Sequence, residues 1–125
     1  MLRNSFFAIG MLSLISVIGS TGLASAGYGA IAFDQHNCAW GRSWNFATAQ
    51  KAAAVALAEC GRRGCKVIVR IGPRQCGSLS STPNCRGWGA ATRSTLAEAQ
   101  NVGLQSCARA NTGTLCTVKV GDCNQ

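Results

Sequence analysis

The sequence is poor in the side chains that most hydrolytic enzymes use for acid–base chemistry. It has one histidine, His36, and only four Asp and Glu residues among 125. Two-carboxylate hydrolysis needs a pair of acids that flank a cleft, and a nucleophilic serine needs a base within reach. No two acids are close in sequence, and only His36, two residues after Asp34, is a conventional base. We therefore predict no catalytic residues, and an enzyme that uses His36 with Asp34 is the weakest of our hypotheses.

Glycine-rich phosphate loops and long apolar runs are also missing. The segment GWGAATRS has neither a Walker lysine nor the dinucleotide-binding spacing, so we predict no cofactor. The apolar stretch at residues 6–18 is shorter than the roughly 20 residues that span a bilayer. It follows Arg3 and precedes an A-x-A site that ends at Ala26, which is typical of a secretory signal peptide. We expect a signal peptide at residues 1–26, cleavage after Ala26, and a secreted or periplasmic mature chain without a transmembrane segment.

Bulky apolar side chains are scarce in the remaining residues 27–125, which we expect to form a single domain. They comprise five Leu, three Ile, six Val, two Phe, three Trp and one Tyr. All eight cysteines lie in the same part, and an even number in an exported chain predicts a disulfide framework. Zinc is disfavoured, because there is one histidine and the spacing of Cys107 and Cys116 is too wide. We predict no metal.

The cysteines reveal an internal duplication. The first set is Cys38, Cys60, Cys65 and Cys76, and the second is Cys85, Cys107, Cys116 and Cys123. Equivalent cysteines of the two sets are separated by 47 residues in three cases and by 51 residues for Cys65 and Cys116. Apolar positions of the first alanine-rich run recur at the same offset, as Ala52 does at Ala99. We predict two repeats within the domain, at about residues 28–75 and 76–123.

Each repeat predicts two strands, a helix and a strand. Alternating residues at 28–34 and 39–46 favour strands, the alanine-rich run at 47–60 favours a helix, and residues 65–71 favour a third strand. Thr95 and Glu98 fit a capping box at the second helix, in which Gly103 is expected to mark a close contact. The predicted fold is a pseudo-twofold α+β domain with one mostly antiparallel sheet and both helices on one face.

The duplication also constrains the disulfides. Two bridges are predicted to join a helix end to the next strand: Cys60–Cys65 and Cys107–Cys116. The other four cysteines allow two arrangements. One pairs equivalent positions, as Cys38–Cys85 with Cys76–Cys123, and the other pairs Cys38–Cys76 with Cys85–Cys123. We favour the first, because it would fasten the two repeats together.

A marked excess of positive charge indicates the class of partner. Without the leader, eleven basic side chains face four acidic ones, a net charge of +7. Such a surface attracts anionic partners, and we expect an envelope polymer or a protein. The basic residues are scattered and the chain is expected to be exported, so a dedicated nucleic-acid role is disfavoured.

Two groups of residues are candidates for ligand contact. Trp40, Arg42 and Trp44 share one face of a predicted strand, where aromatic rings and a guanidinium can hold a sugar or an anion. Trp40 recurs in the second repeat as Trp88, which favours a core role for both, whereas Trp44 has no aromatic counterpart. The second group is Arg62 and Arg63, which we expect to lie on an exposed loop held by the Cys60–Cys65 bridge. Our candidate contact residues are Arg42, Trp44, Arg62 and Arg63.

The ordered segments YGAIAF, WGRSWN, ALAEC, CKVIV, CGSL, GWGAAT and CTVKV resemble a family of small exported bacterial domains, domain-of-unknown-function family 4189. The resemblance covers about residues 28–123 and implies bacterial export and a duplicated, disulfide-bonded domain. It brings no agreed activity and no catalytic residues. Cys38 and Cys85 are additional to the usual pattern, and GSLSS is less apolar than the family's second opening strand.

These observations lead to three functional hypotheses. The first is a non-enzymatic basic domain that binds an anionic envelope component or a protein partner. The second is an inhibitor or effector that acts on a host or competitor enzyme, because a cross-linked loop loses little entropy on binding. The third is the enzyme that uses His36 and Asp34.

Overall fold

The computed structural model describes residues 27–110 and 114–125, so the predicted signal peptide lies outside the described residues. The predicted order of two strands, a helix and a strand is confirmed in both repeats. The elements are β1 (Tyr28–Asp34), β2 (Ala39–Phe46), α1 (Ala49–Cys60), β3 (Lys66–Ile71), β4 (Cys76–Ser81), β5 (Trp88–Arg93), α2 (Leu96–Ala110) and β6 (Thr117–Cys123).

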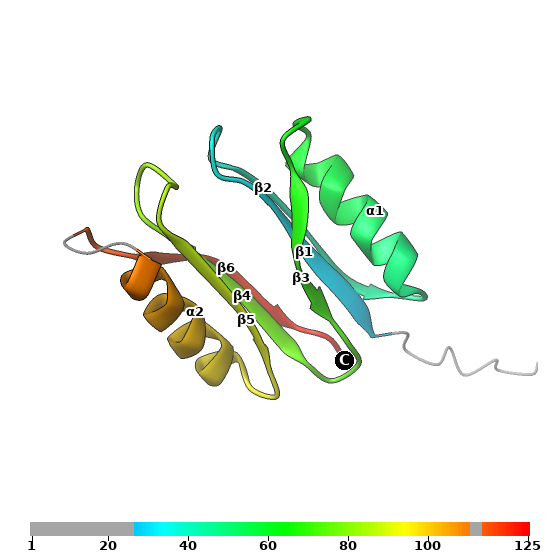
Figure 1. Ribbon diagram of the computed structural model, residues 1–125. Helices are drawn as coiled ribbons and strands as arrows, with labels where there is room; N and C mark the ends of the chain where they lie inside the picture. The colour runs from blue at the N-terminus through cyan, green and yellow to red at the C-terminus, as the bar shows by residue number, and fades with distance from the viewer. Residues whose placement is uncertain (1–26, 111–113) are drawn as a thin grey trace, which may run out of the picture.

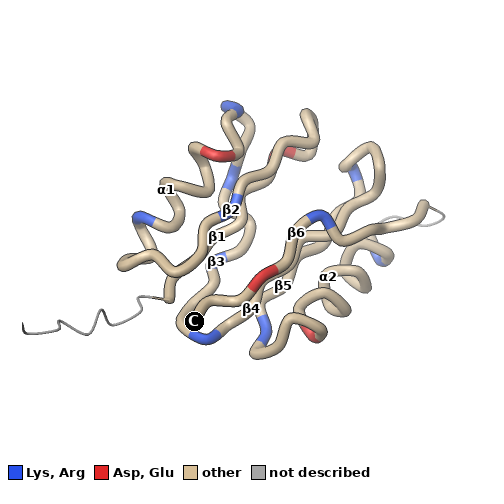
Figure 2. Tube along the Cα trace, turned by 180° about the vertical axis from the view of Figure 1, so that it is seen from behind, with Lys and Arg blue, Asp and Glu red and all other residues tan. Residues whose placement is uncertain are grey.

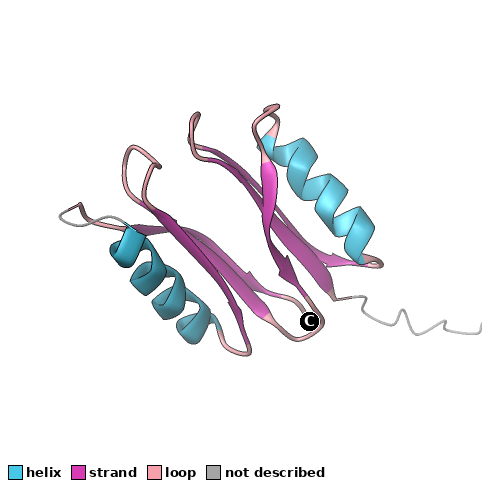
Figure 3. Cartoon of the chain, viewed as in Figure 1, coloured by secondary structure: helices cyan, strands magenta, loops and turns pink. Residues whose placement is uncertain are grey.

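The strands form two antiparallel sheets of three strands each, in the orders β2-β1-β3 and β5-β4-β6. Helix α1 covers the outer face of the first sheet and α2 that of the second, so the two sheets face each other between the helices (Figures 1 and 3). The predicted α+β class and the duplicated unit are confirmed. The expected single sheet with both helices on one face is wrong, because each repeat builds its own sheet.

The pattern of small and large side chains explains this four-layer arrangement. In β1, Ala30 and Ala32 pack with α1, whereas Ile31 and Phe33 belong to the core between the sheets. Successive side chains of a strand point to opposite faces, so both faces of this strand carry apolar residues. A sheet with one helix-covered face and one wet face would leave Ile31 and Phe33 in water.

The core between the sheets is small. Its buried members are Ile31, Phe33, Val69, Ile71, Leu79, Cys85 and Val120. The partly buried Trp40 and Trp88 pack against it, which confirms the core role predicted for both. Two sheets joined by so few large side chains depend on further links between them.

Glycine permits the close approach of each helix to its sheet. A Cβ atom at Gly41 would clash with the α1 backbone at Ala56 and Cys60, and a Cβ at the equivalent Gly89 would clash with the α2 backbone. Gly103 is buried at the second contact, but a Cβ there would lie 3.5 Å from the nearest atom, the carbonyl oxygen of Gly89. The contact expected at Gly103 is therefore present, and the residue that requires glycine is Gly89.

Local hydrogen bonds stabilise the helix ends. The Thr48 side chain accepts from the N–H of Lys51 at 3.1 Å, and Thr95 accepts from the N–H of Glu98 at 3.2 Å. Gly61 ends α1 in the left-handed conformation at φ 72°, and its N–H donates to the carbonyl of Leu57 at 3.0 Å. Helix α1 therefore has a threonine N-cap although it lacks the acidic residue of a capping box.

All eight cysteines form disulfides in the arrangement favoured above. The bridges are Cys60–Cys65, Cys107–Cys116, Cys38–Cys85 and Cys76–Cys123. The first two clamp a helix end to the following strand, as predicted. Cys38–Cys85 joins the β1–β2 hairpin to the β4–β5 hairpin and thus links the two sheets.

The role expected for Cys76–Cys123 is wrong, because both residues lie in the second sheet, opposite each other on β4 and β6. Instead, the residue after Cys123 fastens the repeats. The buried side chain of Asn124 donates to the carbonyls of Ile71 at 3.1 Å and Gly72 at 3.0 Å and accepts from the N–H of Asn45 at 2.9 Å. The disulfide holds this C-terminal clasp in register with the second sheet.

Candidate functional site

A cavity of about 210 Å³ lies where the end of β1 meets the starts of β3 and β5. Its apolar lining comes from Phe33, Ile68 and Trp88, and its polar lining includes Asp34 and Lys66. Trp88 belongs to the second repeat and the other four residues to the first. The stacking of the two repeats therefore supplies the Trp88 wall of the cavity.

Asp34 is the buried charged group of this cavity, with an exposed fraction of 2%. Its carboxylate accepts from the Asn37 side chain at 2.7 Å and from the backbone N–H of His36 at 3.0 Å. The Asn37 hydrogen bond is the main cause that holds the pKa of Asp34 below its ordinary value of 3.8. Burial opposes this shift, whereas backbone hydrogen bonds and the nearby charge of His36 support it. Asp34 is thus an anionic hydrogen-bond acceptor at neutral pH.

Gly64 lines the cavity next to this carboxylate. A Cβ atom at Gly64 would lie 2.6 Å from Oδ2 of Asp34, so a larger residue in the loop between α1 and β3 would displace this carboxylate. The Cys60–Cys65 bridge spans the same loop. One end of the cavity is therefore formed by a cross-linked segment.

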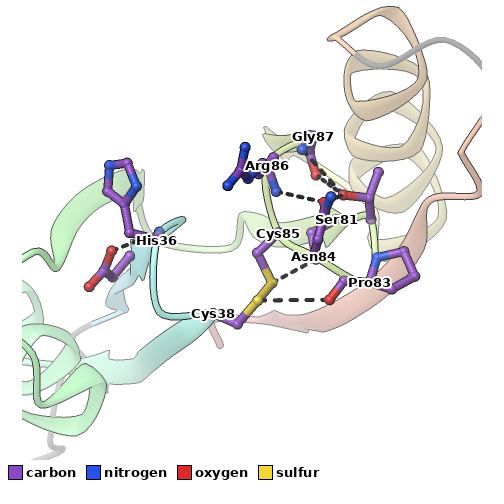
Figure 4. The surroundings of a disulfide bond; sticks show 10 residues. His36, Cys38, Ser81, Pro83, Asn84, Cys85, Arg86 and Gly87 are labelled. Carbon is purple, nitrogen blue, oxygen red and sulfur yellow. Dashed lines mark hydrogen bonds between the residues drawn. A yellow bond between two sulfur atoms is a disulfide. The ribbon is translucent and has the colours of Figure 1, made fainter.

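Two contacts join the hairpins across the cavity. The indole N–H of Trp88 donates to the side-chain oxygen of Gln35 at 2.9 Å, and the Trp88 ring meets the Phe33 ring edge-on at 5.7 Å between centroids. The Cys38–Cys85 bridge lies nearby, with Cys38 exposed and Cys85 buried (Figure 4). Trp88 is therefore held in one orientation by contacts on its ring and on its polar edge.

The β4–β5 hairpin carries Arg86 on a rigid turn. The N–H of Thr82 donates to the carbonyl of Gly87 at 2.8 Å. The side-chain oxygen of Asn84 accepts from the hydroxyl of Thr82 at 2.7 Å and from the N–H of Arg86 at 3.1 Å. The side chain of Arg86 is exposed. This turn, like the loop of Arg62 and Arg63, adjoins a disulfide cysteine.

Basic positions are spread along the described chain, with few acidic positions among them (Figure 2). Arg62, Arg63, Lys66 and Arg86 are exposed on or next to the loops around the cavity. Glu59, at the end of α1, is the exposed acidic residue near these loops. The loop end of the molecule thus combines an open cavity with a basic rim.

The four contact residues predicted from the sequence do not form one surface. Gly41 of β2 faces α1, so Arg42 points to the opposite face of the sheet, where its guanidinium carbon lies 5.8 Å from the centre of the Trp40 ring. Arg62 and Arg63 lie at the helix side, in the loop that leads to β3 on the other edge of the sheet. The two pairs belong to different parts of the surface.

Trp44 is partly a core residue. Its ring packs against the core between the sheets, like the rings of Trp40 and Trp88, and its indole nitrogen is buried without a hydrogen-bond partner among the described residues. The absence of an aromatic counterpart in the second repeat therefore did not indicate a freely exposed side chain. The inner face extends along the whole of β2 and includes both tryptophans.

The sequence reasoning missed Lys66, Gln35 and Trp88 as neighbours in one cavity. The sequence predicts Lys66 only as part of a strand and Trp88 only as a core residue. The sole local signal was the Asp34–Asn37 pair, whose spacing fits a side-chain-capped turn. Nothing local indicates that Trp88, 54 residues after Asp34, lines the same space.

The arrangement differs from a catalytic Asp–His pair. The backbone N–H of His36, and not its imidazole, donates to Asp34, and the imidazole points away from the disulfide (Figure 4). In residues 27–110 and 114–125, no group of three or more His, Cys, Asp or Glu side chains is placed to hold a metal ion. No described helix has the length and hydrophobicity needed to cross a membrane.

Fold and site together define a small, disulfide-linked α+β domain made from two copies of one unit. The chain belongs to the family described as Domain of unknown function (DUF4189), which matches residues 28–123. The resemblance drawn from the short segments is thereby confirmed.

Mycobacterial proteins are among the relatives. Protein Rv1269c of Mycobacterium tuberculosis and Protein Mb1300c of Mycobacterium bovis are each 38% identical over 77 residues, which make up 62% of this chain and 58% of the relative. The match thus spans less than two thirds of these relatives. The NMR structure of Rv1813c from Mycobacterium tuberculosis is similar with a TM-score of 0.59 and 25% identity, covering 99% of this chain and 100% of that one. None of these descriptions names a reaction, ligand or partner, so nothing in them points to catalysis.

Proposed function

We propose that this protein is an exported, non-enzymatic binding domain whose loop end engages an anionic polymer of the cell envelope. The leader sequence and the four disulfides support export to an oxidising compartment. The observation that carries the proposal is the basic rim of Arg62, Arg63 and Arg86 on cross-linked loops around an open cavity.

Rigid loops favour binding for a thermodynamic reason. A side chain on a mobile loop must be ordered when it binds, whereas a loop held by a disulfide has already lost much of that freedom. Arg62 and Arg63 lie between the bridged Cys60 and Cys65, and Arg86 directly follows Cys85. Each of these arginines is thus presented on a restrained backbone.

The proposal is tested by binding of oxidised residues 27–125 to polygalacturonate at low ionic strength, followed by salt titration. The test variant replaces three residues of the rim by alanine: Arg62, Arg63 and Arg86. The control variant makes the same change of charge at the other end of the sandwich: Lys51, Arg74 and Arg93.

We expect the rim variant to bind about tenfold more weakly, since three exposed charge interactions of up to ~1 kcal/mol each are lost. Added salt should weaken the wild type more than the rim variant. Equal loss in both variants, or no binding by the wild type, would contradict the proposal. A stoichiometric, salt-resistant complex with one protein would instead favour the inhibitor or effector hypothesis.

A further inference from the structure

We infer that the cavity between the repeats binds a single sugar ring that carries a carboxylate, such as one uronic acid residue of an envelope polysaccharide. This inference rests on the proposed function, because it names the part of the polymer that the loop end recognises. Its basis is the combination of one fixed aromatic ring, one acceptor and one cation in a small cavity.

The size of the cavity sets the first constraint. Pockets that bury drug-sized ligands measure roughly 300–1,000 Å³, whereas this one measures about 210 Å³. It can enclose one ring but not a longer stretch of polymer. The neighbouring units would then lie over the mouth, where His36 and the rim arginines are exposed.

The aromatic wall sets the second constraint. Trp88 is held by Gln35 and Phe33, so its ring is a fixed platform in the cavity lining. Ile68 adds an aliphatic surface. A sugar ring has an apolar face of C–H groups that packs on such a surface, whereas a flexible acidic peptide offers no comparable flat face.

The polar wall sets the third constraint. The Asp34 carboxylate is an acceptor, and its two observed partners leave lone pairs for further donors, which the hydroxyls of a sugar supply. The Lys66 ammonium has only donors, which suit a carboxylate. A ligand with several carboxylates and no hydroxyls would meet repulsion from Asp34, so the two groups together select an acidic sugar over a simple polyanion.

The test compares three probes on oxidised residues 27–125: a trimer of galacturonate, a trimer of glutamate with matched charge, and the neutral maltotriose. Calorimetry gives the affinities, and ¹H–¹⁵N NMR follows the three indole N–H signals, of which only that of Trp88 reports on the cavity. We expect galacturonate to bind at least about tenfold more tightly than glutamate or maltotriose. We also expect the Trp88 signal to shift, while those of Trp40 and Trp44 stay in place.

A matched pair of variants locates the carboxylate. Lys66→Gln removes the cation of the cavity, and Lys119→Gln removes an exposed cation on β6 of the other sheet. We expect the first to weaken galacturonate binding about tenfold and the second to leave it unchanged.

The outcomes separate the two proposals. Equal binding of galacturonate and glutamate, an unmoved Trp88 signal, or equal effects of the two lysine variants would each overturn the sugar site, even where polyanion binding through the rim persists. Failure of every anionic probe to bind would overturn both the sugar site and the proposed function.

Discussion

The contact between α2 and the second sheet depends on a glycine of the strand, and replacement of Gly89 by alanine tests it. The added Cβ would overlap the Gly103 carbonyl and the Cys107 amide and would lie 2.7 Å from the Cβ of Ser106. The first two are backbone atoms of a helix that a disulfide anchors at Cys107, so they cannot rotate away. The helix must lift from the sheet, and overpacking of this kind typically costs about 1–3 kcal/mol.

The control is Gly103→Ala, on the other side of the same contact. There the new Cβ would meet its nearest neighbours at 3.5–3.8 Å, which is ordinary van der Waals contact. Alanine also favours the helix interior over glycine by about 0.5–1 kcal/mol. The two substitutions add the same methyl group to facing residues, yet we expect them to change stability in opposite directions.

Urea unfolding of the oxidised domain, followed by circular dichroism, measures both effects. A loss of 1 kcal/mol lowers the Tm of a domain of this size by about 4–8 °C, so thermal scans resolve the difference as well. We expect Gly89→Ala to unfold earlier than the wild type and Gly103→Ala to match or exceed it. An unaffected Gly89→Ala protein, or a strongly destabilised Gly103→Ala protein, would refute the helix–sheet contact described above.

Three further changes have defined outcomes. Replacing Cys38 and Cys85 by serine opens a bridge that spans 47 residues, and loop entropy predicts a loss of about 4 kcal/mol in the free energy of unfolding by urea. The same model predicts a loss of about 2 kcal/mol when the five-residue bridge Cys60–Cys65 is opened, and equal losses for the two bridges would contradict this. Because the pKa of Asp34 is lowered, its charge stabilises the fold above pH 3.8, and this contribution disappears as the pH falls through the folded pKa. Asp34→Asn should therefore be less stable than the wild type at pH 7 and equal to it in strong acid, and a difference independent of pH would refute the assignment. Asn124→Ala leaves buried backbone groups unpaired and should lower the free energy of unfolding by about 1–3 kcal/mol. Replacement of the exposed Asn101 by alanine should not destabilise the fold, and similar effects of the two substitutions would argue against the C-terminal clasp.

The order of the elements could be predicted because each repeat shows local periodicity and because the cysteines align the two copies. The stacking of two sheets was missed, although β1 carries the necessary information. Its alternation of alanine with Ile31 and Phe33 predicts a strand, and it also indicates that both faces of this strand must be covered. A face that carries Ile and Phe needs a second layer, and the second repeat supplies it.

The candidate site was less accessible to sequence reasoning for a physical reason. Its polar groups, Asp34 and Lys66, come from one repeat and its aromatic platform, Trp88, from the other, so no local spacing joins them. The basic loop of Arg62 and Arg63 was found, because a bridged loop with glycine at both ends is a local feature. Its neighbourhood depends on the stacking of the sheets, which local patterns do not encode.

Both the fold and the cavity depend on the Cys38–Cys85 bridge between the two hairpins, and disulfide mapping of the exported protein by mass spectrometry tests this bridge most directly. Cys76 and Cys85 fall in one tryptic peptide, so a second cut after Leu79 is needed to separate them. We predict that the fragment with Cys85 is linked to the one with Cys38, and the fragment with Cys76 to the one with Cys123. Fragments that link Cys38 to Cys76, or that carry free thiols, would contradict the stacked arrangement and the site that depends on it.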